Sequence, residues 1–239
     1  MRYLDLTLAT PEENLALEEA LLDSAEDAGG GEILRLWESP RHFAVLGYSC
    51  KVRDDLHYER CLKEALPVLR RASGGGTVLQ GPGCLNFSLI LKISANPSLQ
   101  NITRTNAWVL EKHREVFGAR LGTGVEVEGV SDLTFRSLKF SGNAQRRRRV
   151  YLLFHGTILN AFDTALMSRY LTLPPRRPAY RGERGHETFA ANIPLATEEI
   201  KTLIRKAWPC ENTLPDAPLK KMRALLESRY LQSDWHLKY

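Results

Sequence analysis

The order of strand-like and helix-like segments is the feature of this sequence that most restricts its fold. The two kinds of segment follow one another without strict alternation, and no internal repeat divides the chain. This order predicts a mixed, largely antiparallel sheet with helices packed on it, because strict alternation is typical of a parallel sheet. We therefore expect an α+β domain over residues 1–195, followed by a short helical tail over residues 196–239 and no full accessory domain.

Local signals place the individual elements. Thr10-Pro11-Glu12-Glu13 is typical of a capping box with proline in the first turn, so we expect a helix that begins there and ends at the glycines 29–31. Further helices are expected over Val52–Leu66, near Thr105–Phe117, and as two helices from about Thr197 that are separated by Pro209, Pro215 and Pro218. Strands are expected over Ile33–Trp37, Phe43–Gly47, Pro67–Arg70, Leu85–Ile93, Val125–Glu128, Leu133–Phe135, Lys139–Ser141 and Val150–Leu159.

Composition excludes several classes of protein. Of the 239 residues, 43% are hydrophobic and 26% are charged, which excludes a disordered or fibrous chain. No segment approaches the ~18 uninterrupted apolar residues of a membrane span, so no membrane partner is expected. The four cysteines form no C-x-x-C pair, and we expect reduced thiols in a cytoplasmic protein.

Arginines are concentrated in two places. Arg146–Arg149 form a continuous run, and five further arginines, from Arg169 to Arg184 and including Arg176, lie close together in the sequence. Such runs usually form solvated faces, but they also suit phosphate or an acidic protein partner, such as a carrier domain. Few aromatic residues are interleaved with them, so no nucleic-acid partner is expected.

A glycine-rich loop follows a basic pair, in Arg70-Arg71-Ala72-Ser73-Gly74-Gly75-Gly76-Thr77. Its glycines would leave backbone N–H groups free to converge on an anion, and the arginines would add charge-assisted bonds to phosphate or carboxylate. The segment matches neither a Walker loop nor G-x-G-x-x-G. A hairpin turn that only requires positive φ is the alternative.

Two more segments carry polar residues inside strand-like runs. Lys139 lies between two apolar residues, ahead of a predicted polar turn, and period-two alternation directs its side chain away from theirs. It is either an edge-strand lysine or an amine aimed at a substrate. His155 interrupts an apolar strand and precedes Gly156, which suggests close backbone approach. A buried structural histidine is the alternative there.

Together these segments resemble one family. R-R-A-S-G-G-G-T-V, then S-D-L with K-F-S-G-N-A-Q, then F-H-G-T-I-L-N are similar, in order and spacing, to the catalytic domain of the lipoate–protein ligase A family. P-E-E-N-L-A-L-E-E-A-L-L and R-L-W-E-S-P near the N-terminus resemble the same family, so the resemblance covers roughly residues 1–195. It implies a biotin/lipoate ligase-like fold, similar to the catalytic core of class II tRNA synthetases.

The resemblance also implies an activity, its cofactors and its partners. Such ligases use ATP and Mg²⁺ to activate lipoate, or octanoate, as the acyl-adenylate. They then pass the acyl group to a lysine of a lipoyl carrier domain, which is the H protein or the E2 subunit of a 2-oxoacid dehydrogenase. A separate accessory subunit is left open, because some ligases of this family are bipartite.

The matching motifs imply roles for individual residues. Lys139 would be catalytic, bridging the acyl carbonyl and the α-phosphate, and Asp132 would meet magnesium or the nucleotide. Arg71 and the amides of Gly74, Gly75 and Gly76 would hold the adenylate phosphate, and Asn86, His155, Gly156 and Thr157 would line the floor of the acyl pocket. The residues implied in substrate or adenylate binding are Arg71, Ser73, Gly74, Gly75, Gly76, Thr77, Asn86, Asp132, Ser141, Gly142, His155, Gly156 and Thr157.

Octanoyltransferases share this fold and are the alternative. They take an octanoyl or lipoyl group from a carrier protein without ATP, through a cysteine thioester. No cysteine lies just before the Lys139 segment or near Leu171–Pro175, where the transferases of this fold carry one, and Cys84 does not match either placement. The sequence therefore favours the ligase. It departs from many ligases at Ser131, where they have asparagine, and at Gln80, where they have histidine.

Overall fold

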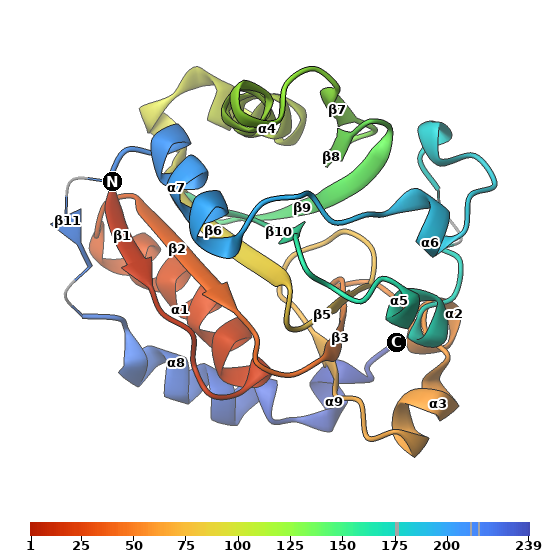
Figure 1. The fold of residues 1–239 in the computed structure, drawn as a ribbon. Helices are drawn as coiled ribbons and strands as arrows, with labels where there is room; N and C mark the ends of the chain where they lie inside the picture. The colour runs from red at the N-terminus through yellow and green to blue at the C-terminus, as the bar shows by residue number, and fades with distance from the viewer. Residues whose placement is uncertain (175–176, 211, 215) are drawn as a thin grey trace.

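The large sheet organises the molecule (Figure 1). The computed structural model describes residues 1–174, 177–210, 212–214 and 216–239. Within this part of the chain, eight strands form one sheet in the order β11-β1-β2-β6-β10-β9-β8-β7. Their bounds are β1 Arg2–Asp5, β2 Ile33–Glu38, β6 Cys84–Lys92, β7 Val125–Glu128, β8 Asp132–Phe135, β9 Leu138–Arg147, β10 Tyr151–Leu159 and β11 Asn212–Thr213.

The pairing of these strands is mixed. Neighbours from β2 to β7 are antiparallel, whereas β1 pairs parallel with both β2 and β11. The prediction of a mixed, largely antiparallel sheet is confirmed. The predicted polar turn after Lys139 is wrong, because β9 continues to Arg147 while pairing with β10 on one side and β8 on the other.

A second sheet of three strands supports the glycine loop. Its order is β4-β3-β5, with bounds β3 Phe43–Leu46, β4 Val68–Arg70 and β5 Val78–Gln80. Residues 71–77 connect β4 to β5, which lie on either side of β3 and do not pair with each other. The glycine loop is therefore a connection across the sheet, and the hairpin alternative is wrong.

The helices partly follow the predicted bounds. The α-helices are α1 Pro11–Ala28, α2 Val52–Asp55, α3 Tyr58–Lys63, α4 Ile102–Leu121, α5 Ala165–Tyr170, α6 His186–Phe189, α7 Thr197–Ala207, α8 Leu219–Leu225 and α9 Ser233–His236. A π-helix covers Leu226–Tyr230, and 3₁₀ turns cover Ile93–Ala95, Pro97–Gln100 and Ala179–Arg181.

The termini of α1 follow the prediction. The capping box is formed by Thr10 and Glu13, and Gly29 closes the helix in the left-handed conformation with φ of 66°. The single helix predicted from Val52 is wrong. It is divided into α2 and α3 because Leu56 is extended, pairs with Leu171 and is buried in the core.

Helices cover both faces of the large sheet. On one face, α4 and α7 bury apolar side chains of alternate strand residues, including Leu36, Phe87 and Phe154. On the other face, α1 packs on Ile33, Ile90 and neighbouring residues (Figure 1). In the described part of the chain, no helix is long and apolar enough to cross a membrane.

The segment from Thr197 onward, expected as a short helical tail, packs along its described residues on the rest of the molecule. Strand β11 extends the large sheet beyond β1, and Met222 of α8 is buried against α1. Helix α9 reaches the small sheet, where the Arg70 amide donates to His236 Nδ1 at 2.9 Å. Pro215, one of the prolines predicted to separate the last helices, lies outside the described residues.

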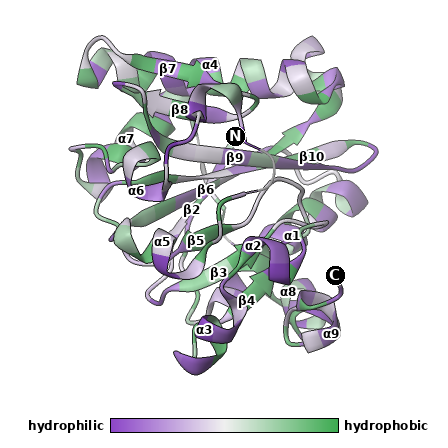
Figure 2. Ribbon diagram, turned by 90° about the vertical axis from the view of Figure 1, so that its right-hand side faces the viewer, coloured by the Kyte–Doolittle hydropathy of each residue, from purple (hydrophilic) through white to green (hydrophobic). Residues whose placement is uncertain are grey.

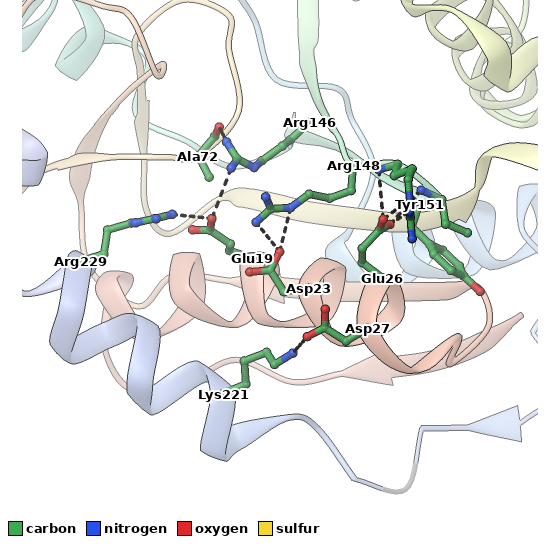
Figure 3. Close-up of polar contacts among 12 residues, drawn as sticks. Glu19, Asp23, Glu26, Asp27, Ala72, Arg146, Arg148, Tyr151, Lys221 and Arg229 are labelled. Atoms are coloured by element: carbon green, nitrogen blue, oxygen red, sulfur yellow. Dashed lines mark hydrogen bonds and ion pairs between the residues drawn. The ribbon is translucent and has the colours of Figure 1, made fainter.

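One side of α1 carries carboxylates that bind two other parts of the chain (Figure 3). Asp23 pairs with Arg148 in the β9–β10 hairpin, and Asp27 pairs with Lys221 of α8. Glu26 accepts hydrogen bonds from the backbone amides of residues 149–151. Figure 2 shows that the tip of this hairpin is hydrophilic.

Candidate active site

A strip of polar side chains crosses the face of the large sheet that α4 and α7 do not cover. Asn86 and Ser88 of β6 pair with Thr157 and His155 of β10, so all four share this face. Thr157 Oγ1 donates to Asn86 Oδ1 at 2.8 Å and accepts from Gln80 Nε2 at 3.0 Å. The structure thus brings together Asn86, His155 and Thr157, which were predicted as floor residues.

The glycine loop lies over this strip. A Cβ placed on Gly75 would lie 3.5 Å from Ala144 Cβ on β9, and Arg146 donates to the Ala72 carbonyl at 2.7 Å. On its other side the loop packs on Gly47, where a Cβ would lie 1.9 Å from the Gly75 carbonyl oxygen. Only glycine at position 47 lets the loop approach β3 this closely.

Arg71 braces the loop from inside. This buried guanidinium donates to the carbonyls of Gly74 at 2.7 Å and Gly76 at 2.8 Å, and to the Val45 carbonyl at 3.3 Å. Most of its donors are therefore used within the chain. Within the described residues the amides of Gly74, Gly75 and Gly76 make no hydrogen bond, and these exposed amides are the groups free to meet an anion.

A buried hydrogen-bonded chain ties the loop to α1. Ser73 Oγ lies 2.6 Å from His155 Nε2, and His155 Nδ1 lies 2.9 Å from Glu18 Oε2. The other carboxylate oxygen accepts from Trp37 Nε1 at 3.1 Å and from Ser88 Oγ at 2.6 Å. Burial raises the pKa of Glu18, but the hydrogen bonds from His155 and Ser88 and the charge of Arg35 lower it below its usual range.

Lys139 lies in the interior of the sheet. Its Nζ is 2.7 Å from Asp132 Oδ1, and Tyr180 donates to Asp132 Oδ2 at 2.7 Å. Burial, followed by the charge of Asp132, raises the pKa of Tyr180. Since β9 lies between β8 and β10, the edge-strand interpretation of Lys139 is wrong. Phe140 packs in the core of the opposite face, as alternation predicted.

Gly142 makes room for the lysine. A Cβ at this position would lie 2.9 Å from both Cε and Nζ of Lys139. Gly142 thus faces the ion pair, whereas Ser141 pairs with Leu133 on the core face because a β-bulge interrupts the pairing of β8 with β9. Gly156 also lies on the core face of the sheet, where a Cβ would lie 1.9 Å from Asn143 Oδ1. The structure does not bring Ser141 and Gly156 to the polar strip.

The remaining predicted residues have partners inside the chain. Thr77 donates to Asp55 at 2.5 Å. In the Arg146–Arg149 run, Arg146 and Arg147 donate to backbone carbonyls and Arg148 pairs with Asp23, so most of this run does not form the free basic surface that was predicted. Arg176 lies outside the described residues.

None of the four thiols is activated as a nucleophile. Burial raises the pKa of each, at Cys50, Cys61, Cys84 and Cys210, and most strongly at the fully buried Cys84. Cys50 lies nearest the glycine loop, with Sγ 3.3 Å from the Gly75 carbonyl oxygen, and Asp55 raises its pKa further.

Three residues of the site were missed from the sequence. Glu18 was assigned to no role, although Glu18 and Glu19 interrupt the apolar side of α1. That interruption was a usable signal, because buried carboxylates require partners. Tyr180 and Phe189 cover the Asp132–Lys139 pair, with the Phe189 ring 5.9 Å from Lys139 Nζ. Their sequence neighbourhood held no comparable signal.

Asp132 is the carboxylate predicted to meet magnesium. Across residues 1–174, 177–210, 212–214 and 216–239, no group of three His, Cys, Asp or Glu side chains could hold a metal ion. Magnesium is often held by one or two carboxylates together with substrate phosphates, so a single aspartate fits an ion that arrives with a nucleotide.

Comparison with known proteins identifies the family. Residues 10–204 match the lipoyl protein ligase A/B catalytic domain. A provisionally named lipoate-protein ligase A of Aeropyrum pernix is 30% identical over 216 residues, covering 90% of this chain and 76% of that protein. The octanoyltransferase LipM of Carboxydothermus hydrogenoformans is 30% identical over 192 residues, covering 71% of this chain and 68% of that protein.

Solved structures share the fold. A bipartite lipoate protein ligase from Thermoplasma acidophilum, studied with its E2 lipoyl domain, aligns with a TM-score of 0.84 at 21% identity, over 99% of this chain and 95% of that one. A lipoate-protein ligase A bound with ATP aligns with a TM-score of 0.81 at 21% identity, over 99% and 98% of the two chains. The chain belongs to the lipoyl protein ligase A/B catalytic domain family, and it is an enzyme of acyl transfer to lipoyl domains.

Proposed function

We propose that this protein is an ATP-dependent lipoate–protein ligase. It activates lipoate or octanoate as the acyl-adenylate and transfers the acyl group to a lysine of a lipoyl carrier domain, the H protein or an E2 subunit. The observation that carries the ligase over a thioester mechanism is that burial raises the pKa of all four thiols. A thioester intermediate requires a reactive thiolate, whereas adenylation requires none.

The polar groups of the site suit adenylation. Attack of a carboxylate on an α-phosphate brings negative charges together, so fixed cations and N–H donors stabilise the transition state. Lys139 supplies the cation, and the free amides of Gly74, Gly75 and Gly76 supply donors for phosphate oxygens. Asp132 orients the Lys139 ammonium at 2.7 Å. Magnesium, held by Asp132 and the nucleotide phosphates, would neutralise further phosphate charge.

Two relatives support the proposed partners. The Thermoplasma acidophilum structure is of a bipartite ligase studied with an E2 lipoyl domain, and a relative from the same organism is named lipoate-protein ligase A subunit 1. That relative is 23% identical over 94% of this chain and 91% of its own length. An E2-type lipoyl domain is therefore the acceptor of choice for an assay, and a second subunit is to be added if activation or transfer fails without it.

Octanoyl transfer without ATP is the second candidate, because the relative LipM has the same identity to this chain, 30%, as the ligase relative, over 71% of this chain. In this reaction one cysteine would hold the acyl group, and Cys50 is the thiol beside the glycine loop. Transfer from an octanoyl carrier protein that requires no ATP and is abolished in Cys50→Ser would establish this activity instead.

Replacement of Lys139 tests the ligase directly. In lipoate-dependent exchange of labelled pyrophosphate into ATP, Lys139→Ala should lower the rate on the order of 10²–10³-fold, because it removes the cation that stabilises the transition state. The exposed Lys63 serves as a matched control, and Lys63→Ala should exchange at the wild-type rate. Exchange at the wild-type rate in Lys139→Ala would contradict the mechanism.

A further inference from the structure

The contacts around Ser73 form a chain of hydrogen bonds from Arg71 to Glu18 in which one assignment of the hydrogens gives every buried donor an acceptor. Arg71 Nε can only donate, and it lies 3.0 Å from Ser73 Oγ, so this oxygen accepts. We assign the Ser73 hydroxyl as the donor to His155 Nε2 at 2.6 Å, because an oxygen that accepted from both neighbours would leave its own hydrogen buried without an acceptor among the described residues. This assignment places the hydrogen of His155 on Nδ1, which donates to Glu18 Oε2 at 2.9 Å.

Glu18 is well suited to end this chain. Its first oxygen already accepts from Trp37 and Ser88, so the carboxylate is held in one orientation from two strands. The second oxygen faces His155 and, as a carboxylate, can only accept. The titratable or charged groups packed around it are His155 of β10, Arg35 of β2 and, beyond Ser73, Arg71 of the glycine loop.

We propose that Glu18 is a positioning residue for the glycine loop. By fixing the Nδ1–H tautomer of His155, it directs the hydroxyl hydrogen of Ser73 away from Arg71. The Arg71 guanidinium can then donate to Ser73 Oγ and to the carbonyls of Gly74 and Gly76. The geometry of the anion-binding amides is thus set from α1. Only the expected effect on pyrophosphate exchange rests on the proposed function; the tautomer of His155 does not.

Substituting Glu18 by glutamine should reverse the direction of the hydrogen bonds between Ser73, His155 and residue 18. If the amide oxygen keeps its bonds with Trp37 and Ser88, the NH₂ group faces His155 Nδ1, which must then accept. His155 Nε2 becomes the donor to Ser73 Oγ, an oxygen that already accepts from Arg71. The Ser73 hydroxyl hydrogen is left without its acceptor in a buried site, and the loop loses its fixed geometry.

The experiment reads the tautomer and the rate separately. ¹⁵N NMR of the His155 imidazole at pH 8 should give the neutral Nδ1–H tautomer in the wild type and the Nε2–H tautomer in Glu18→Gln. In pyrophosphate exchange, Glu18→Gln should lower kcat/KM about tenfold or more, as expected for loss of transition-state contacts at a displaced loop. A wild-type ring that is doubly protonated or carries hydrogen on Nε2 would overturn the assignment, whether or not the variant folds.

Asp23→Asn is the matched control. Asp23 lies on the same helix, but its hydrogen bonds go to Arg148 of the β9–β10 hairpin and not to the glycine loop (Figure 3). This variant should lower the melting temperature while leaving the His155 tautomer and, within about twofold, the exchange kcat/KM unchanged. Equal kinetic losses in both variants would reduce Glu18 to a structural role. Absence of exchange in the wild type would instead count against the proposed ligase and leave the tautomer result standing.

Discussion

Gly142 occupies a position where any side chain would collide with the proposed catalytic amine. A Cβ on Gly142 would lie 2.9 Å from Lys139 Nζ. Its absence leaves the space in which Lys139 reaches Asp132. Backbone conformation does not require this glycine, because Gly142 is not among the glycines with positive φ. The requirement comes from the neighbouring side chain alone.

Gly142→Ala should therefore separate activity from stability. The new methyl group displaces Lys139 Nζ from Asp132, and we expect pyrophosphate exchange to fall on the order of 10²-fold, because a misplacement of about 1 Å at a reacting group has this effect. Gly118 of α4 is the control, since a Cβ there meets open space. Gly118→Ala should keep the wild-type rate and stabilise the helix by about 0.5–1 kcal/mol. Retained exchange in Gly142→Ala would show that the ion pair is dispensable.

His113 makes the fold sensitive to acid. Burial, with Lys112 nearby, lowers its pKa to about 3, and its Nε2 accepts from Trp208 Nε1 at 2.7 Å. Between pH 6.5 and 3 the unfolded chain binds the additional proton, so the free energy of unfolding should fall as the pH falls, by up to about 1.4 kcal/mol per pH unit. His113→Gln keeps an acceptor for Trp208 and removes the titration. Urea unfolding between pH 7 and 5 should show a flatter profile in this variant, and an unchanged slope would refute the assignment.

At the scale of elements, the short helix α9 fastens the strand that leads into the glycine loop. The Arg70 guanidinium donates to the His236 carbonyl at 2.9 Å and to the Gly47 and Cys50 carbonyls at 2.8 and 2.7 Å. His236 in turn accepts from the Arg70 amide. Strand β4, the end of β3 and α9 are thus joined at one buried arginine.

His236→Ala should loosen this junction. It leaves the Arg70 amide buried without an acceptor, which costs about 1–3 kcal/mol of stability. Amide hydrogen exchange should become faster over residues 70–77, because the loop loses support at its first strand. Lys220→Ala, at an exposed position of α8, should change neither quantity. A loop whose protection is unaltered in His236→Ala would show that α9 only covers the surface.

The sequence predicted the elements that local signals determine. The start of α1 follows from four adjacent residues, and the strands β6 and β10 follow from continuous apolar runs. The length of β9 depends on pairing with strands on both sides, and the break at Leu56 depends on Leu171, which is distant in the sequence. In the site, the motif residues could be proposed from spacing, but the role of Glu18 depends on a histidine 137 positions away.

At the scale of the whole molecule, α1 joins parts that lie far apart in the sequence. Its carboxylates hold the β9–β10 hairpin through Arg148 and the C-terminal helices through Lys221 and Arg229 (Figure 3). The same helix carries Glu18 to the centre of the polar strip. The first long helix of the chain therefore forms hydrogen bonds with residues that follow it by more than 100 positions.

The junction at Arg70 has a consequence for biosynthesis. The acceptor for the Arg70 amide is 166 residues downstream, so the strand that leads into the glycine loop lacks this anchor until His236 has been synthesised. At about 5–20 residues per second, this interval lasts on the order of ten seconds. A nascent chain stalled before His236 would carry every motif of the site and still present an incompletely anchored loop.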